Sequence, residues 1–128
     1  MPTTPTLLVV DDERIVADTL VLIFKRYGFA ATAVYSGTEA VEAAKILQPD
    51  ALVADVIMPG ISGIETAIRI REMLPSCKIL LLSGFASTEE LLKRAQKEGH
   101  YFEVVAKPVP PEELIRRLSD MRRQKLGA

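Results

Sequence analysis

The chain has 128 residues, with 16 basic and 17 acidic side chains and a formal net charge of −1. Hydrophobic residues make up 48% and charged residues 26%, which is typical of a single globular domain and does not indicate nucleic acid or an anionic membrane as the main partner. No apolar run is long enough to span a bilayer, and the lone Cys77 cannot form an internal disulfide, so we expect a cytoplasmic protein.

Five short apolar runs predict five strands, at residues 7–10, 29–34, 51–55, 78–82 and 102–106. The run at 51–55 is apolar up to its final residue, Asp55, and such runs are typical of strands buried on both faces of a parallel sheet. A carboxylate at the end of a buried strand is costly unless a partner neutralises it, so we expect the rest of the chain to supply that partner.

Apolar residues at helical spacing follow each run and predict five helices. The first is predicted from Ile15, Val16, Leu20, Ile23, Phe24 and Tyr27. The second is expected to face inward through Ala40, Ala44 and Leu47. Gly28 and Gly99 are expected to close the first and fourth helices in the left-handed conformation, and Pro111 suits the first turn of the last.

Strand and helix therefore alternate five times, which predicts a doubly wound α/β fold, a parallel sheet with helices on both faces. Two capping boxes support the predicted helix starts, one at residues 36–39 and one at 87–90. In the first box, Ser36 is expected to accept from the amide of Glu39, while the Glu39 side chain reaches back to Ser36. The spacing leaves no room for a second domain.

Polar side chains follow four of the predicted strands, at the point where each strand ends. These residues are Asp11 and Asp12, Asp55, Ser83, and Lys107. Because the carboxyl ends of the strands in a doubly wound sheet open onto one rim, we expect these side chains to meet in one crevice. Each pattern alone has an ordinary explanation as a cap or a turn, but all four at one rim predict a site.

The charges of this crevice indicate its chemistry. Three carboxylates and one ammonium leave two negative charges, which one Mg²⁺ would balance, and Mg²⁺ prefers oxygen ligands and keeps several waters. Phosphoryl transfer needs mostly positioning and charge neutralisation, which a metal, a lysine and a hydroxyl can supply. Asp55 is then the candidate nucleophile, as in aspartyl-phosphate chemistry.

Two other functions use similar residues. A Mg²⁺-dependent phosphohydrolase with Asp55 as nucleophile needs a second carboxylate, commonly two positions on, where this chain has Ile57. We therefore expect no turnover on phosphate esters. A flavodoxin-like mononucleotide binder is the third interpretation, and the carboxylates at the rim argue against it because they repel phosphate in the absence of a metal.

The combined motifs resemble the receiver domain of two-component response regulators, from about residue 6 to about residue 126. The segments that carry the resemblance are VVDDE at 9–13, DVIMPG at 55–60 with Gly63, LSG at 82–84 and KP at 107–108. The resemblance implies a flavodoxin-like (βα)5 fold, a five-stranded parallel sheet with strand order 2-1-3-4-5. It implies a bacterial signalling domain that catalyses only its own aspartyl phosphorylation and dephosphorylation. We expect one receiver domain over residues 1–128 with no output domain in this chain, which is then either a stand-alone receiver or a fragment of a longer regulator.

The resemblance also implies the phosphoacceptor and the metal ligands. In this family the aspartate in the place of Asp55 accepts a phosphoryl group from a sensor histidine kinase or a histidine phosphotransfer protein. The same resemblance implies that Asp12 binds Mg²⁺ directly and Asp11 mainly through water. Asp55 itself and the backbone carbonyl of Ile57 complete the implied ligand set.

The resemblance assigns the remaining site residues to the phosphoryl group. Ser83 and Lys107 are expected to contact it, and the bond before Pro108 is expected to be cis. The chain departs from the family three positions before the lysine, where Val104 replaces a common aromatic residue that turns inward on activation. Phe102 shares the face of Val104, because side chains alternate along a strand, but it lies at the far end of that strand.

The expected output is a change in partner binding. Phosphorylation would shift an equilibrium between two arrangements of the surface formed by the fourth helix, the fifth strand and the last helix. Phe85, just past Gly84, is expected to slow or redirect the access of water to the phosphate. We expect a downstream protein target, no direct binding of nucleic acid or membrane, and a monomer or a weak phosphorylation-dependent dimer.

Overall fold

The computed structural model describes residues 4–84 and 88–127, with the backbone alone from residue 121 onward. Phe85 and the capping serine Ser87 lie outside the described residues, so the expectations attached to them stay predictions. Within the described ranges, strands and helices alternate along the chain in the predicted order.

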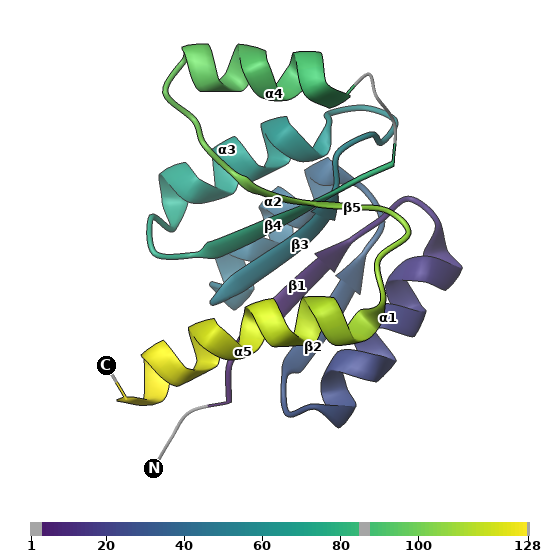
Figure 1. The fold of residues 1–128 in the computed structure, drawn as a ribbon, viewed down its shortest axis with the longest axis vertical. Helices are drawn as coiled ribbons and strands as arrows, with labels where there is room; N and C mark the ends of the chain where they lie inside the picture. Colours follow the sequence, from purple (N-terminus) through teal and green to yellow (C-terminus); the bar gives the residue numbers. More distant parts are fainter. Residues whose placement is uncertain (1–3, 85–87, 128) are drawn as a thin grey trace.

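The sheet has five parallel strands in the spatial order β2-β1-β3-β4-β5 (Figure 1), which confirms the predicted topology. Its strands are β1 (Thr6–Val10), β2 (Ala30–Val34), β3 (Ala51–Asp55), β4 (Lys78–Ser83) and β5 (Glu103–Ala106). β2 and β5 each begin one residue later than predicted. The chain winds in both directions from β1, so the switch point at which ligands bind in such sheets lies between β1 and β3.

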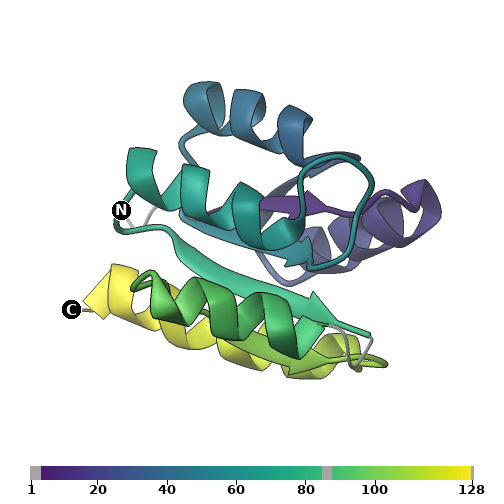
Figure 2. The same ribbon diagram turned by 90° about the horizontal axis from the view of Figure 1, so that it is seen from above.

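Helices cover both faces of the sheet (Figures 1 and 2). They are α1 (Arg14–Arg26), α2 (Gly37–Leu47), α3 (Gly63–Met73), α4 (Thr88–Lys97) and α5 (Pro111–Gly127). α1 and α5 pack on one face, and α2 and α3 pack on the other, with α4 joining them through Ala95. Among the described residues, none of these helices combines the length and the apolar character that a membrane crossing requires.

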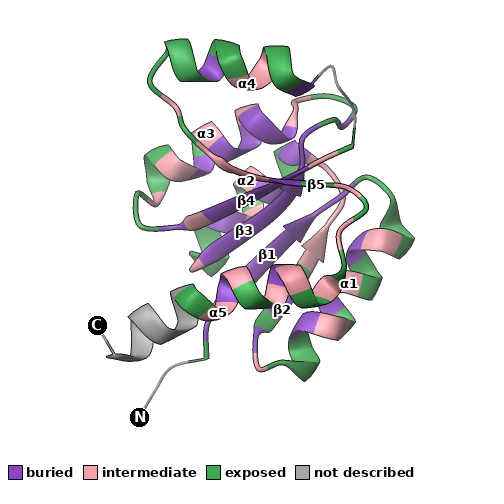
Figure 3. Cartoon of the chain, in the orientation of Figure 1, coloured by how far each residue is buried: buried purple, intermediate pink, exposed green. Residues whose placement is uncertain are grey.

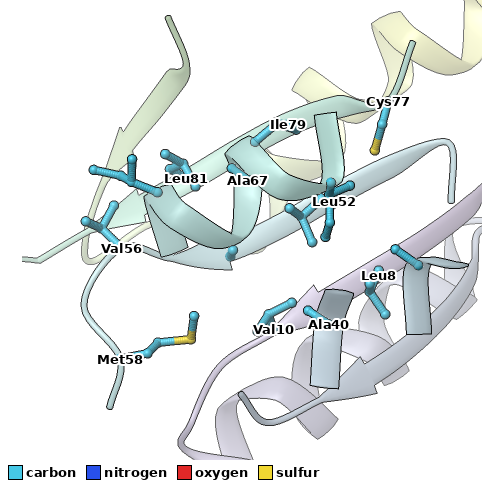
Figure 4. Close-up of a cluster of buried hydrophobic side chains, with 14 of the residues drawn as sticks. Leu8, Val10, Ala40, Leu52, Val56, Met58, Ala67, Cys77, Ile79 and Leu81 are labelled. Atoms are coloured by element: carbon cyan, nitrogen blue, oxygen red, sulfur yellow. The ribbon is translucent and has the colours of Figure 1, made fainter. Parts of the chain in front are cut away.

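The core follows the alternation of side chains along the strands. Leu52 and Ala54 of β3 pack toward α2 and α3, in the cluster drawn in Figure 4, while Ala51 and Val53 pack toward α1 and α5. All five residues of β3 are buried, and the strands at the centre of the sheet are the most buried part of the chain (Figure 3). Asp55 therefore ends a strand with no exposed face, as the sequence predicts.

The helix caps confirm some expectations and correct one. Ser36 accepts from the amide of Glu39, but the Glu39 carboxylate accepts from the amide of Tyr35 at 2.9 Å, one residue earlier than expected. This longer reach fits a Ser36 backbone that is fully extended, with φ −155° and ψ 160°. The sequence pattern also missed a cap at α3, where Ser62 accepts from the amide of Glu65. Gly28 and Gly99 adopt positive φ, as predicted.

The apolar periodicity of two helices overstates what they bury. Ile15 of α1 is 82% exposed and Tyr27, which follows the last residue of this helix, is 51% exposed, whereas the buried residues of α1 are Ala17, Val21 and Phe24. The small Ala17 is fully buried, so it lets α1 approach the sheet closely and turns Ile15 toward solvent. In α2, Leu47 is 38% exposed because the helix ends there, beyond the buried alanines.

Candidate functional site

Three carboxylates meet at the carboxyl edge of the sheet. Asp11 and Asp12 follow β1, Asp55 ends β3, and one carboxylate oxygen from each lies within 4.8 Å of the others. The two strands are neighbours with Val10 paired to Ala54, so their carboxyl ends are brought level. Doubly wound topology thus produces the cluster from Asp11 and Asp55, which are 44 positions apart in the sequence.

Asp11 is the most buried member, with 1% of its surface exposed. Its Oδ1 accepts from the amide of Glu13 at 3.0 Å, whereas the buried Oδ2 has no hydrogen-bond partner among the described residues. Burial raises the pKa of Asp11, and the charges of Asp55 and Asp12 add to this effect, although the Glu13 amide opposes it. A buried carboxylate oxygen without a partner, beside two further carboxylates, fits a hard divalent cation.

Replacing Asp11 with asparagine is expected to stabilise the fold at neutral pH. Because the pKa of Asp11 is raised on folding, its ionisation costs stability as the pH rises through that range. We expect the melting temperature of Asp11→Asn at pH 7 to exceed that of the wild type by about 3–5 °C, which corresponds to roughly 1 kcal/mol. Thermal unfolding followed by circular dichroism, in the absence of divalent metal, measures this difference.

The gain should disappear toward about pH 3, where the carboxyl group is protonated in both states. Asp18→Asn, in the exposed part of α1, serves as the control and should bring no gain. An Asp11→Asn protein that is less stable than the wild type at neutral pH would contradict the inference that the buried charge of Asp11 destabilises the fold.

Lys107 supplies the positive charge of the site. Its Nζ donates to Oδ2 of Asp55 at 2.8 Å, and its backbone amide donates to the carbonyl of Ser83 at 2.8 Å. Burial by itself lowers the pKa of Lys107, but the hydrogen bond and the charges of Asp55 and Asp11 outweigh burial and raise it. The bond to Pro108 is cis, as the resemblance implies. Lys107 is therefore a protonated counter-ion held against the candidate nucleophile.

The hydroxyl of Ser83 is hydrogen-bonded to the start of α4, whereas Lys107 is bonded to Asp55. Ser83 ends β4, and its Oγ forms a short hydrogen bond with Oγ1 of Thr88, the first residue of α4. Sequence reasoning treated Thr88 only as part of a capping box. A contact between two hydroxyls at the ends of different elements follows no spacing rule, so no sequence signal pointed to it.

An open cleft of about 650 Å³ surrounds the cluster. The site residues that line it are Asp12, Asp55, Ile57, Gly84 and Lys107. Its walls are apolar where α1 faces the segment after β5 and include Val16, Leu20 and Val109. A Cβ added at Gly84 would lie 3.4 Å from Cδ of Lys107, so glycine leaves room beside the lysine chain. The cleft has space for a phosphoryl group and its donor.

The position three residues before Lys107 is Val104, which is half-buried and packs against the core beneath α2 and α3. Phe102 packs against the same core, as the alternation predicts. The Arg71 guanidinium lies 4.5 Å from the centroid of the Phe102 ring, and the His100 ring stacks with Phe102 at 6.5 Å between centroids. Phe102 is thus held just before β5 begins, at the opposite end of the strand from Lys107.

Comparison with known proteins identifies relatives that align with nearly the whole chain. The sequence matches the family model described as "Response regulator receiver domain" over residues 7–119. It is 32% identical over 119 residues to the transcriptional regulatory protein CreB of Escherichia coli, an alignment that covers 93% of this chain and 51% of CreB. It is 34% identical over 121 residues to the response regulator MprA of Mycobacterium ulcerans, covering 94% of this chain and 51% of MprA. The chain spans about half the length of these curated relatives. The solved structure of the Vibrio cholerae chemotaxis protein CheY4 has a TM-score of 0.80 and 25% identity, over 93% of this chain and 99% of that chain.

Proposed function

The chain belongs to the response regulator receiver domain family, a signalling family, and from this premise we propose that Asp55 is its phosphoacceptor. The observation that carries the proposal is the meeting of three carboxylates within 4.8 Å, one of which is also bonded to Lys107 at 2.8 Å. Asp55 is the member that ends the central strand and lines the cleft, where a donor can approach it. Asp11 is buried beneath the cluster, which suits a supporting role.

The proposed metal is Mg²⁺, held by Asp12 and Asp55 directly, by Asp11 mainly through water, and by the backbone carbonyl of Ile57. Mg²⁺ at this point would neutralise the carboxylates and the phosphoryl oxygens, which is the largest electrostatic contribution to this kind of transfer. The buried oxygen of Asp11, the charge balance and the all-oxygen donor set support this assignment.

In the proposed reaction the chain's own residues position the charges. A carboxylate oxygen of Asp55 attacks the phosphorus, and the leaving group departs with the electron pair of the bond that breaks. Lys107 shifts from the carboxylate to a phosphoryl oxygen, and the hydroxyl of Ser83 donates to another. Hydrolysis of the acyl phosphate returns Asp55 to its first state, so the domain catalyses only its own phosphorylation and dephosphorylation.

The proposed donor is a sensor histidine kinase or a histidine phosphotransfer protein, and the proposed location is cytoplasmic.

Ile15 and Leu22, seven residues apart on the same side of α1, are 82% and 63% exposed. They form an apolar stripe that begins three residues after Asp12 in the sequence and suits a helical partner that presents a phosphohistidine. The same stripe explains why the apolar pattern of α1 exceeds what this helix buries.

The proposed output surface is formed by α4, β5 and α5. Glu103 of β5 forms ion pairs on both sides. It pairs with Lys78 of β4 at 2.9 Å, and it also pairs with Arg117 of α5, so it connects two elements of the surface to each other and to β4. We propose that phosphorylation changes how this surface binds a downstream protein, with the chain acting as one receiver unit that is a monomer or a weak dimer.

Intact mass spectrometry after incubation with acetyl phosphate and Mg²⁺ tests the proposal. We expect a single phosphoryl adduct that disappears when a chelator removes the metal and decays again over time. Turnover of a phosphate ester should be absent. Replacing acetyl phosphate with a phosphorylated histidine phosphotransfer protein tests the donor class, and Ile15→Asp should slow that reaction alone. If neither donor produced an adduct, the phosphoacceptor function would be excluded.

A further inference from the structure

The cleft around the carboxylate cluster has two parts of different chemistry. Its charged lining residues belong to the site itself and are Asp12, Glu13, Asp55 and Lys107. A second set of lining side chains is wholly apolar and comes from α1, from β4 and from the chain around the start of α5, which lies beside α1 (Figure 1). We call this set the apolar recess, and its members are Val16, Leu20, Leu82, Val109 and Leu114. A ligand that extends from the site into the recess meets carbon atoms there.

Val16 is the member of the apolar recess that the core does not explain. Leu82 and Leu114 belong to the core cluster on this face of the sheet, and Leu20 and Val109 pack against it. Val16 is half-buried but, of the side chains that the structure describes, is not one that packs into either core cluster. It lies one helical turn before Leu20 and therefore shares its face of α1. An apolar wall beside a few converging charges is typical of a site for a small ligand with one apolar end.

We propose that the apolar recess binds the acyl chain of a small phosphodonor. Asp55 would then take its phosphoryl group faster from an acyl phosphate with a longer apolar chain than from acetyl phosphate. This inference rests on the proposed function, because it concerns the donor of the phosphoryl group to Asp55. Val16 and Leu20 determine donor specificity in this scheme, since they contact the chain of the leaving group and not the phosphorus.

The direction of the transfer puts the leaving group into the cleft. The attacking and leaving oxygens are roughly in line at phosphorus. A carboxylate oxygen of Asp55 attacks, the bond from phosphorus to the bridging oxygen breaks, and the donor leaves as a carboxylate with that electron pair, so no proton has to move. The leaving group therefore lies on the side of the phosphoryl group that faces away from Asp55, in the open cleft that the apolar recess also lines.

The two parts of the cleft complement the two ends of such a donor. The anionic phosphoryl end suits Lys107, whose Nζ lies 2.8 Å from Oδ2 of Asp55. Each methylene of the chain that is fully buried in the recess strengthens binding by about fourfold. A polar group in the chain would give up its bonds to water, because the side chains of the recess offer no donor or acceptor. The recess thus favours unsubstituted acyl chains.

Comparison of butyryl phosphate with acetyl phosphate tests the inference in the wild-type chain. The two donors release carboxylates of nearly equal basicity, so a difference in rate reports the chain and not the chemistry at phosphorus. We expect butyryl phosphate, which has two more methylenes, to react about fivefold faster below saturation, because the open cleft buries each methylene only in part. Intact mass after timed incubation with Mg²⁺ measures both rates. Their ratio within one preparation does not depend on the fraction of active protein.

Val16→Thr keeps the shape of the wall and adds a hydroxyl to it. This variant should lower the ratio of the butyryl rate to the acetyl rate to about twofold. Val41→Thr is the matched control, because Val41 is a half-buried valine of α2 that packs against the core on the other face of the sheet. It should keep the wild-type ratio.

Inhibition by alkylphosphonates, which cannot transfer their phosphoryl group, is a second measurement that needs no variant. Propylphosphonate should inhibit phosphorylation by acetyl phosphate at about fivefold lower concentration than methylphosphonate, again because of two more methylenes. Equal rates from the two donors, equal inhibition by the two phosphonates, or a ratio that Val16→Thr leaves unchanged would overturn the inference. An adduct from acetyl phosphate would still uphold the phosphoacceptor function in those cases. Absence of an adduct from both donors would overturn both.

Discussion

Asp55→Asn is expected to abolish phosphorylation by acetyl phosphate, with at least about a hundredfold loss in the rate of adduct formation. The amide keeps the shape of the carboxylate but carries no negative charge and is a far weaker nucleophile. The substitution also removes the ion pair with Lys107, so the lysine loses its 2.8 Å partner. The removal of a charge beside Asp11 and Asp12 offsets that loss in part, so the variant should remain folded.

The measurement is intact mass after timed incubation with acetyl phosphate and Mg²⁺. Asp50→Asn is a matched control, because Asp50 lies just before the other end of the same strand and its Oδ2 accepts from the amide of Thr6 at 2.8 Å. An asparagine there can still accept this bond, so the control should be phosphorylated at the wild-type rate. If Asp55→Asn still gained a phosphoryl group, and the modified peptide contained Asp12, the nucleophile would be Asp12, the exposed carboxylate of the cluster, and not Asp55.

The charged part of the site could be predicted from the sequence because topology decides it. A strand buried on both faces shows as a uniform apolar run, and once the sheet is parallel and doubly wound its carboxyl ends must share one rim. Asp11, Asp12 and Asp55 then meet whatever their separation in the chain. The ion pair of Lys107 with Asp55 has the same origin, as charges of opposite sign in one crevice attract.

The contacts that the sequence did not predict depend on side-chain direction instead of strand order. The bond between Ser83 and Thr88 joins the end of β4 to the start of α4, and no periodic pattern in the sequence indicates such a contact. The exposure of Ile15 depends on the rotation of α1, which is set by the close contact of Ala17 with the sheet. Periodicity identifies an amphipathic helix, but with apolar residues around much of α1 it could not select which of them face the core.

The structure supplies the physical reason for Gly63, which the sequence identifies only as part of the family resemblance. Its position is the first of α3, and its amide donates to the carbonyl of Val56 at 2.8 Å. A Cβ at this position would lie 2.0 Å from the carbonyl oxygen of Asp55 and 2.8 Å from the carbonyl carbon. Both atoms belong to the backbone of β3, so no side chain can rotate away to make room. The glycine is required because α3 begins in direct contact with the residue proposed as phosphoacceptor.

Gly63→Ala is therefore expected to destabilise the fold by about 3 kcal/mol or more, which lowers the melting temperature by roughly 10 °C. Relief of the clash requires the start of α3 and the end of β3 to move apart, so Asp55 should also shift relative to Asp11 and Asp12. We expect the folded fraction of the variant to be phosphorylated more slowly than the wild type, even at a temperature well below its melting transition. Thermal unfolding and timed adduct formation measure the two effects.

Gly60→Ala is the control from the same loop, because the two glycines matter for different reasons. Gly60 has a φ of +79°, and a Cβ added there would meet open space, so alanine brings backbone strain of about 1–2 kcal/mol without any clash. Its loss of stability should be the smaller of the two, and it should leave the phosphorylation rate near that of the wild type. Two outcomes would contradict this explanation: equal losses of stability in the two variants, or a Gly63→Ala variant as stable as the wild type. In either case the close packing of α3 against Asp55 would not determine the position of the phosphoacceptor.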